Sequence, residues 1–134
     1  MDKIDFAPIE KVIKSLDEII ERYNRESYDD AVRDALIQRF EYTYSLSLKY
    51  LNKFLKLMLP ESEDNLTFNE IIREANKFGL LESNLEQWTV YRQKRNMSSH
   101  TYNEEIAKSV VVVAYEFQKE VHFVLEQLKK NCHD

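Results

Sequence analysis

The stretch that decides the fold is NEEIAKSVVVVAYEFQKEVHFVLEQLKKN, residues 103–131. Its apolar residues recur every three or four positions, at Ile106, Val110, Val113, Phe117, Val121, Val124 and Leu128. This spacing predicts a long helix with one apolar face. That face would line either the core of a helical bundle or a seam between two copies of the chain. For any single position we favour the core.

The N-terminal part of the chain has the same periodicity. We expect a first helix over residues 6–23, with Asp5 as its N-cap and Pro8 in its first turn, where the missing N–H costs little. Its predicted apolar stripe comprises Phe6, Ile9, Val12, Ile13, Leu16, Ile19, Ile20 and Tyr23.

A second, longer helix is expected to begin at Asp29 or Asp30 and to end before Pro60, because proline cannot continue a helix. An acidic loop follows over residues 61–66. The predicted stripe of this helix comprises Leu36, Phe40, Tyr44, Leu48, Leu51, Leu55 and Met58.

Three further helix starts carry the capping-box pattern, a Ser or Thr followed three residues later by Glu. The pairs are Thr67 and Glu70, Ser83 and Glu86, and Thr101 and Glu104. They predict helices over residues 68–78, 84–98 and 103–131, the first of them ended by Gly79. We therefore predict an all-α protein, an antiparallel up-down four-helix bundle with an additional short helix, forming a single domain over residues 1–134.

The composition supports this fold and excludes several functions. The chain has one glycine and two prolines in 134 residues, too few for the many turns of a β-sandwich or barrel. One glycine also cannot build a P-loop or a dinucleotide-binding loop. The net charge of −5 argues against broad electrostatic binding of nucleic acid, although a local basic patch could still bind it.

Other features indicate where the protein works. Cys132 is the only cysteine, so the chain forms no internal disulfide, which fits a reducing compartment. No apolar run approaches the length of a membrane span, and the first residues lack a signal-peptide pattern. We expect a cytoplasmic protein that does not bind membranes. No metal-ligand spacing is present, and we expect no cofactor.

One segment departs from a generic bundle, WTVYRQKRNMSSHTY, residues 88–102. It contains Arg92, Lys94, Arg95 and His100 and no acidic residue. The cations could simply complement the negative end of a helix dipole. Alternatively, they form an anion site at the junction of two helices.

Arg95 and His100 would lie on different faces of a continuous helix, but a break at residues 98–99 lets both point into one cleft. Arginine suits phosphate, and histidine can move protons near neutral pH. Together they are the minimum for cleaving RNA without a metal ion, and a two-fold dimer would supply a second histidine. Equally, His100 could be structural and Tyr102 an ordinary surface tyrosine. We expect His122 to be structural, and His133 lies in the tail.

The residues of this segment resemble a known family. Arg95-Asn-Met-Ser-Ser-His100-Thr-Tyr102 is similar to the Arg-x4-His-x-Tyr motif of HEPN domains, small prokaryotic helical proteins encoded beside minimal nucleotidyltransferases. Signatures of the nucleotidyltransferase substrate-binding (HepT-like) branch follow in the expected order at Leu36–Tyr44, Ile72–Ala75, Gly79–Leu81, Trp88 and Ser99–Tyr102. The family's second helix usually carries Glu and Trp where this chain has Ser45 and Leu48.

The resemblance implies a homodimer that pairs with its cognate minimal nucleotidyltransferase and takes RNA or a nucleotide as its ligand. In one interpretation the protein is a ribonuclease toxin with Arg95 and His100 as catalytic residues and Asn96 and Ser99 in support. The partner would be the antitoxin and would attach AMP to Tyr102. In the other, the protein is a non-catalytic subunit that binds the nucleotidyltransferase's substrate. A helical adaptor with no active site is the third possibility.

Overall fold

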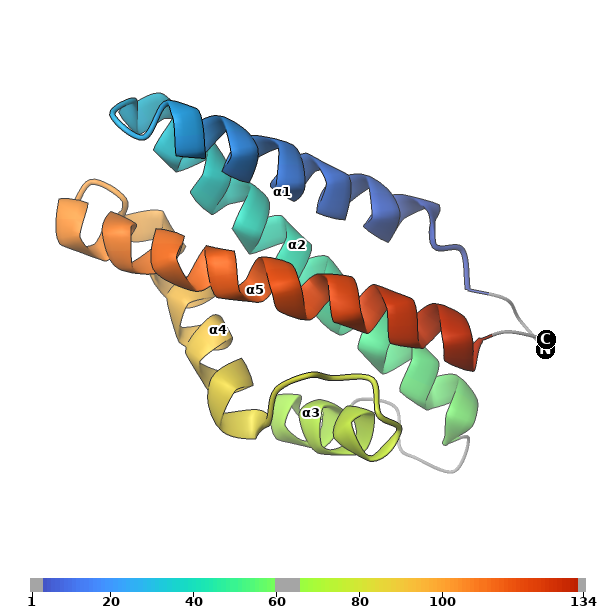
Figure 1. Ribbon diagram of the computed structural model, residues 1–134. Coiled ribbons are helices and arrows are strands. Elements are labelled where there is room, and N and C mark those ends of the chain that lie inside the picture. Colours follow the sequence, from blue (N-terminus) through green and yellow to red (C-terminus); the bar gives the residue numbers. More distant parts are fainter. Residues whose placement is uncertain (1–3, 60–65, 133–134) are drawn as a thin grey trace.

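The computed structural model describes residues 4–59 and 66–132, and all of its regular structure is helical. Three long helices, α1 (Ala7–Arg25), α2 (Asp30–Met58) and α5 (Glu104–Asn131), lie side by side, and the shorter α4 (Leu85–Met97) and α3 (Phe68–Lys77) complete the bundle (Figure 1). The turn between α1 and α2 and the junction between α4 and α5 lie at the same end of the molecule. The predicted fold class is confirmed.

The first two helices begin close to the predicted residues. The N-cap position of α1 is Phe6, one residue after the expected Asp5, yet the Asp5 carboxylate still accepts a hydrogen bond from the N–H of Ala7 at 3.0 Å. Pro8 lies in the first turn as expected. Asp29 caps α2 by accepting from the N–H of Ala31 at 2.9 Å. Pro60 and residues 61–65 lie outside the described residues.

Helix α3 has both of its predicted end signals. Thr67 and Glu70 form the reciprocal capping box, with bonds of 2.9 and 3.2 Å. Gly79 follows the helix with φ of +72°, the left-handed conformation that glycine adopts without steric cost. Its N–H and the N–H of Leu80 donate back to the carbonyls of Asn76 and Ala75, which is the hydrogen-bond pattern of a Schellman motif.

The other two predicted capping boxes do not form, although the helices that they predict exist. In both, the N-cap is a different residue from the one predicted. Asn84 caps α4 by accepting from the N–H of Gln87, and Asn103 caps α5 by accepting from the N–H of Ile106, both at 3.1 Å. Thr101 has helical backbone angles because the chain is still turning there, whereas an N-cap residue needs an extended backbone such as that of Asn103.

The core is formed by the predicted apolar stripes. Met58, the last residue of α2, is the clear exception, with 42% of its surface exposed. An aromatic cluster at the centre ties α4 to α2 and α5; its members are Phe40, Tyr44, Trp88, Tyr91 and Phe117. Of the seven stripe residues of α5, all but the half-buried Ile106 are buried within the single chain, so this face lines the bundle core.

Within the described residues, none of the helices is both long and apolar enough to cross a lipid bilayer.

Candidate active site

The candidate site lies where α4 ends. The helix stops at Met97 and tightens into the 3₁₀ turn η1 (Ser98–His100), which confirms the predicted break at residues 98–99. Ser98 is the buried residue of this turn. Its hydroxyl lies 2.5 Å from Oε2 of Glu41 and 2.6 Å from the carbonyl oxygen of Arg95, and its single proton can serve one of them at a time. This contact fixes the turn against α2.

His100 and Tyr102 lie together on the surface beyond this anchor. The Tyr102 hydroxyl is 3.1 Å from Nδ1 of His100, and the two rings meet edge to face with centroids 5.7 Å apart. Tyr102 is 85% exposed. Nε2 of His100 has no hydrogen-bond partner in the part of the chain that the structure describes, so the nitrogen that points away from the tyrosine can meet a substrate.

The tyrosine suits either protonation state of His100. A hydroxyl both donates and accepts. It accepts from Nδ1–H when Nε2 is bare and His100 can act as a base, and it accepts in the same way from the imidazolium, whose Nε2–H can act as an acid. His100 can therefore act as an acid or as a base through Nε2 without rearrangement of its neighbour.

Arg95 is held from α2 by two weak contacts. Its Nε donates to the Ser45 hydroxyl at 3.4 Å, and its Nη2 is 3.9 Å from Oε1 of Glu41. The side chain remains 40% exposed, which leaves guanidinium donors available to a ligand. Arg95 and His100, both among the described residues, make no hydrogen bond with each other.

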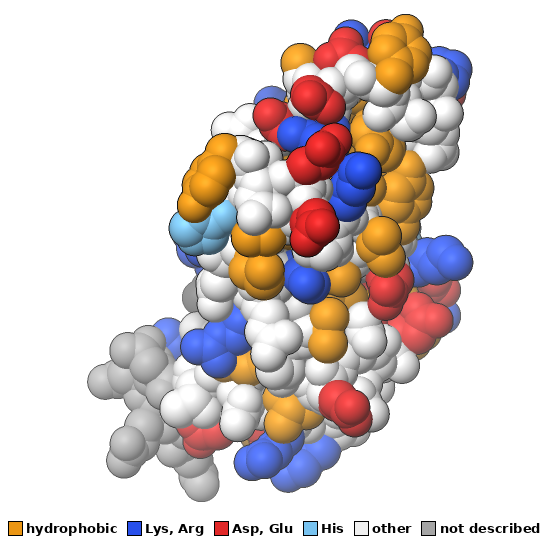
Figure 2. Space-filling view, turned by 90° about the vertical axis from the view of Figure 1, so that its left-hand side faces the viewer, with side chains coloured by type: hydrophobic (Ala, Val, Ile, Leu, Met, Phe, Trp, Pro, Cys, Tyr) orange, Lys and Arg blue, Asp and Glu red, His pale blue; other side chains and the backbone are white. Residues whose placement is uncertain are grey.

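The predicted basic pocket is only partly formed. Arg92 lies over the ring of Phe68 of α3, with its Cζ 4.8 Å from the centroid, whereas Lys94 points to the other side and donates to Ser109 of α5 at 3.3 Å. Asn96 and Ser99 are exposed and make no polar side-chain contact with another described residue. On this end of the bundle, acidic and basic side chains are interspersed (Figure 2).

Glu41 also belongs to this site, and its contacts with Ser98 and Arg95 were not predicted from the sequence. The segment over residues 88–102 has no acidic residue, but the fold brings Glu41 to it from α2. The signal was present in the resemblance, because Glu41 lies inside the stretch Leu36–Tyr44. Spacing along the chain could not pair it with a residue more than fifty positions later.

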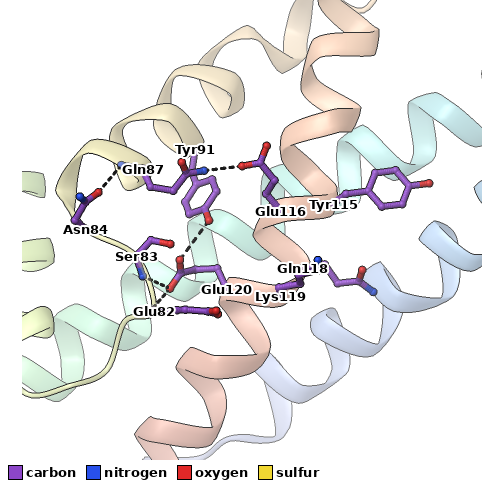
Figure 3. A pocket seen from close by; sticks show the side chains of 10 residues that line it. All are labelled: Glu82, Ser83, Asn84, Gln87, Tyr91, Tyr115, Glu116, Gln118, Lys119 and Glu120. Atoms are coloured by element: carbon purple, nitrogen blue, oxygen red, sulfur yellow. Dashed lines mark hydrogen bonds between the residues drawn. The ribbon is translucent and has the colours of Figure 1, made fainter.

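A cavity lies elsewhere, at the start of α4. It has a volume of about 730 Å³, and its lining includes Glu82, Glu116, Glu120 and Lys119 (Figure 3). Because the carboxylates outnumber the single cation, this cavity repels phosphate. The candidate active site is therefore not at this cavity.

Glu120 has a structural role in this cavity. Its buried carboxylate accepts hydrogen bonds from the N–H groups of Glu82 at 2.7 Å and Ser83 at 3.3 Å, and from the Tyr91 hydroxyl at 3.2 Å. Burial and, after it, the negative charge of Glu120 raise the pKa of Tyr91, so the hydroxyl stays protonated and donates. An acidic residue inside the apolar stripe of residues 103–131 was the sequence signal for this role.

The remaining candidates behave as expected where they are described. Nε2 of His122 lies 2.9 and 2.8 Å from the two carboxylate oxygens of Asp17, on the surface between α5 and α1, so His122 is a structural residue. His133 lies outside the described residues. In the described part of the chain, three or more His, Cys, Asp or Glu residues nowhere gather as a metal site would require.

Comparisons with known proteins agree with the resemblance. Residues 4–130 match the model of the family described as "Nucleotidyltransferase substrate binding protein like". A Haemophilus influenzae protein named "Probable ribonuclease HepT" is 33% identical over 139 residues, which cover 96% of this chain and 94% of that protein.

Two solved structures are similar to the chain. One, of a Haemophilus influenzae protein, is described as revealing the fold of a substrate binding domain of a nucleotidyltransferase. It has a TM-score of 0.86 and 30% identity, and the match covers 93% of this chain and 99% of that one. The other, of a Thermus thermophilus protein, has a TM-score of 0.70 and 27% identity over 90% of this chain and 98% of that one.

Proposed function

Because the chain belongs to the nucleotidyltransferase substrate-binding-protein-like family, we propose that it is a HepT-like endoribonuclease that cleaves RNA without a metal ion. It would be the toxin of a two-gene system whose other component is a minimal nucleotidyltransferase. The observation that carries the proposal is the exposed 3₁₀ turn. There His100 keeps Nε2 open to solvent, Tyr102 supports Nδ1, and Arg95 lies one helical turn earlier.

The reaction needs one base and one acid. His100 of one protomer takes the proton from a ribose 2′-hydroxyl, whose oxygen attacks the neighbouring phosphorus. His100 of the second protomer protonates the 5′-oxygen as its bond to phosphorus breaks, which leaves a 2′,3′-cyclic phosphate. Arg95 donates to the phosphate oxygens as charge builds on them. A homodimer that joins two such turns in one cleft, with Asn96 and Ser99 at its edge, would complete the site.

The cleavage assay tests this proposal with a matched pair of histidine variants. We expect the purified protein to cleave a labelled RNA in the presence of EDTA, and His100→Ala or Arg95→Ala to lower the rate about a hundredfold or more. His122→Ala removes another surface histidine and should leave the rate unchanged. Absence of cleavage by the unaltered protein, or full cleavage by His100→Ala, would contradict the proposal.

Tyr102 is the residue through which the partner would act. Its hydroxyl attacks the α-phosphorus of ATP, pyrophosphate leaves, and His100 Nδ1 is placed to accept the phenolic proton. The 85% exposure of Tyr102 gives a second enzyme access to it. The attached AMP would put bulk and negative charge beside His100 and keep RNA phosphate away from Arg95.

Mass spectrometry tests the modification. The protein is incubated with the nucleotidyltransferase encoded beside it and ATP, and we expect its mass to rise by one AMP group. Tyr102→Phe should gain none. Tyr28→Phe, which alters another highly exposed tyrosine, should gain as much as the unaltered protein.

A second candidate function is that of a non-catalytic subunit that binds the substrate of its nucleotidyltransferase. It is favoured by the similar Haemophilus influenzae structure, which is described as the fold of such a substrate binding domain. It predicts a complex with the nucleotidyltransferase whose affinity depends on nucleotide, together with no RNA cleavage. Failure of the two proteins to co-purify would count against it.

A further inference from the structure

Arg95 and His100 lie on opposite sides of a break in the chain. Arg95 is in the last turn of α4 and His100 ends the 3₁₀ turn η1, and these two described side chains make no hydrogen bond with each other. The proposed reaction needs both groups at one phosphate, and an error of about 1 Å in their relative place can cost about a hundredfold in rate. A third group must therefore hold the two sides of the break in register.

Glu41 of α2 contacts both sides of the break. Its Oε2 is 2.5 Å from the hydroxyl of the buried Ser98, which lies two residues before His100. Its Oε1 is 3.9 Å from Nη2 of Arg95. One carboxylate thus spans the break, with one oxygen on each side.

Helix α2 holds Glu41 in place through the core. Its neighbour Phe40 is 0% exposed and packs edge to face on Phe117 in the aromatic cluster. Ser45 lies one turn further along the same face of α2 and accepts a hydrogen bond from Nε of Arg95 at 3.4 Å. Glu41 and Ser45 therefore form a short polar row on α2 beside the end of α4.

The contacts with this row leave part of the Arg95 guanidinium free. They engage Nε and Nη2, whereas both N–H groups of Nη1 have no hydrogen-bond partner among the described residues. The ion pair is loose, because its atoms are 3.9 Å apart and the side chains of Arg95 and Glu41 are 40% and 39% exposed. A close bidentate pair would occupy the donors that a phosphate needs. Glu41 is thus near enough to direct Arg95 and too distant to occupy those donors.

We propose that Glu41 is a positioning residue of the candidate active site, whose carboxylate sets the place of the Arg95 guanidinium relative to His100. It acts on Arg95 by charge and on Ser98 by a hydrogen bond, and it touches no substrate atom itself. The inference rests on the proposed function for the reaction that is positioned. It adds a residue of α2 to a site whose proposed catalytic and supporting residues all come from residues 95–102.

The kinetics of Glu41→Gln test the role of the charge. The amide keeps an oxygen that can accept from Ser98 and loses the negative charge beside Arg95. We expect kcat to fall about tenfold with little change in KM, because Arg95 then meets the charge that develops on the phosphate less well. Glu18→Gln removes the same charge from an exposed position on α1 and should cleave like the unaltered protein. Both variants should keep the melting temperature of the unaltered protein; a large fall in Glu41→Gln would assign Glu41 to the fold alone.

A double variant tests whether Glu41 acts through Arg95. Arg95→Ala has no guanidinium to position, so adding Glu41→Gln to it should slow cleavage no further. Arg95→Ala combined with Glu18→Gln is the matched control. A further tenfold fall in the first double variant would mean that Glu41 acts by another route, and the inference would be wrong.

Nuclear magnetic resonance measures the positioning without any cleavage. In isotope-labelled protein, the Nε–H signal of Arg95 is identified by its absence from Arg95→Lys. We expect this signal to lie apart from those of exposed arginines and to move toward them in Glu41→Gln but not in Glu18→Gln. A signal that stays in place in Glu41→Gln would overturn the inference.

The outcomes separate this inference from the proposed function. If RNA is cleaved through His100 and Glu41→Gln cleaves it as fast as Glu18→Gln does, the ribonuclease stands and the positioning role falls. If RNA is never cleaved but the Arg95 signal moves in Glu41→Gln, the ribonuclease falls. The positioning role then stands, for the ligand that a non-catalytic subunit would bind at the same place.

Discussion

The two ends of helix α4 satisfy their polar groups in opposite ways. At the start, Asn84 caps the helix, and the preceding loop donates two backbone N–H groups to the buried carboxylate of Glu120. At the end, Arg95 is held by contacts of 3.4 and 3.9 Å, and His100 and Tyr102 lie on the surface. One end contributes its hydrogen-bonding groups to the fold, and the other leaves them available for a ligand.

The difference between the two ends indicates which polar groups of this helical bundle remain free to bind a ligand. A polar network that is complete within the protein stabilises one conformation but has little left to offer a ligand. Donors that have few hydrogen-bond partners within the protein stabilise the fold less, but they remain free to bind a ligand. On this argument we assign a structural role to the cavity beside Glu120 and propose the end of α4, around Arg95, as the functional site.

Glu120→Ala should have the largest effect on stability. It leaves two backbone N–H groups and the Tyr91 hydroxyl without their shared acceptor, so we expect the free energy of unfolding to fall by about 3 kcal/mol. Urea denaturation measures it. Glu116→Ala, which removes an exposed carboxylate from the rim of the same cavity, should cost less than about 0.5 kcal/mol. An equal fall in the free energy of unfolding in the two variants would contradict the distinction drawn between the two ends of α4.

Ser98→Ala should have an intermediate effect. It breaks the one short contact that anchors the end of α4 to Glu41, and we expect a loss of about 1 kcal/mol in the free energy of unfolding. The same variant should slow RNA cleavage, because the turn that carries His100 is less firmly placed. Ser99→Ala alters the exposed neighbour and serves as the control for stability. A Ser98→Ala protein that kept full stability would show that the end of α4 is positioned by other contacts.

His100→Ala should have the smallest effect on stability. The imidazole is exposed, and its one hydrogen bond within the described residues is with the exposed Tyr102. The free energy of unfolding should therefore change by less than about 0.5 kcal/mol while RNA cleavage is lost. Thermal denaturation beside the cleavage assay measures both. A large drop in melting temperature would assign His100 to the fold and would weaken its proposed catalytic role.

Most of the fold could be predicted because helix signals are local. The apolar stripes, Asp29 and the Thr67–Glu70 capping box gave the helices to within about two residues of their observed ends. The errors were local as well. Ser83 and Thr101 matched a capping pattern, but the chain places Asn84 and Asn103 at the extended positions that cap a helix.

The candidate site was predictable only in part. The break in the chain and the exposure of Tyr102 followed from the sequence, and the structure has both. The predicted gathering of Arg92, Lys94 and Arg95 in one anion site did not hold. Lys94 turns toward α5, while Arg92 and Arg95 contact α3 and α2. Which side of a bundle a surface side chain reaches depends on the packing of helices that lie far apart in the chain.

The sequence by itself determined where the helices lie, which of their faces are buried, and which segment carries the unusual residues. The tertiary structure alone decided the partners of those residues. Glu41 meets Ser98 across 57 positions of the chain, and Glu120 meets Glu82 across 38. The physical reason is that the helical period determines only on which face of its own helix a side chain lies. The partner it meets there depends on how whole helices cross, which is a property of the packed core.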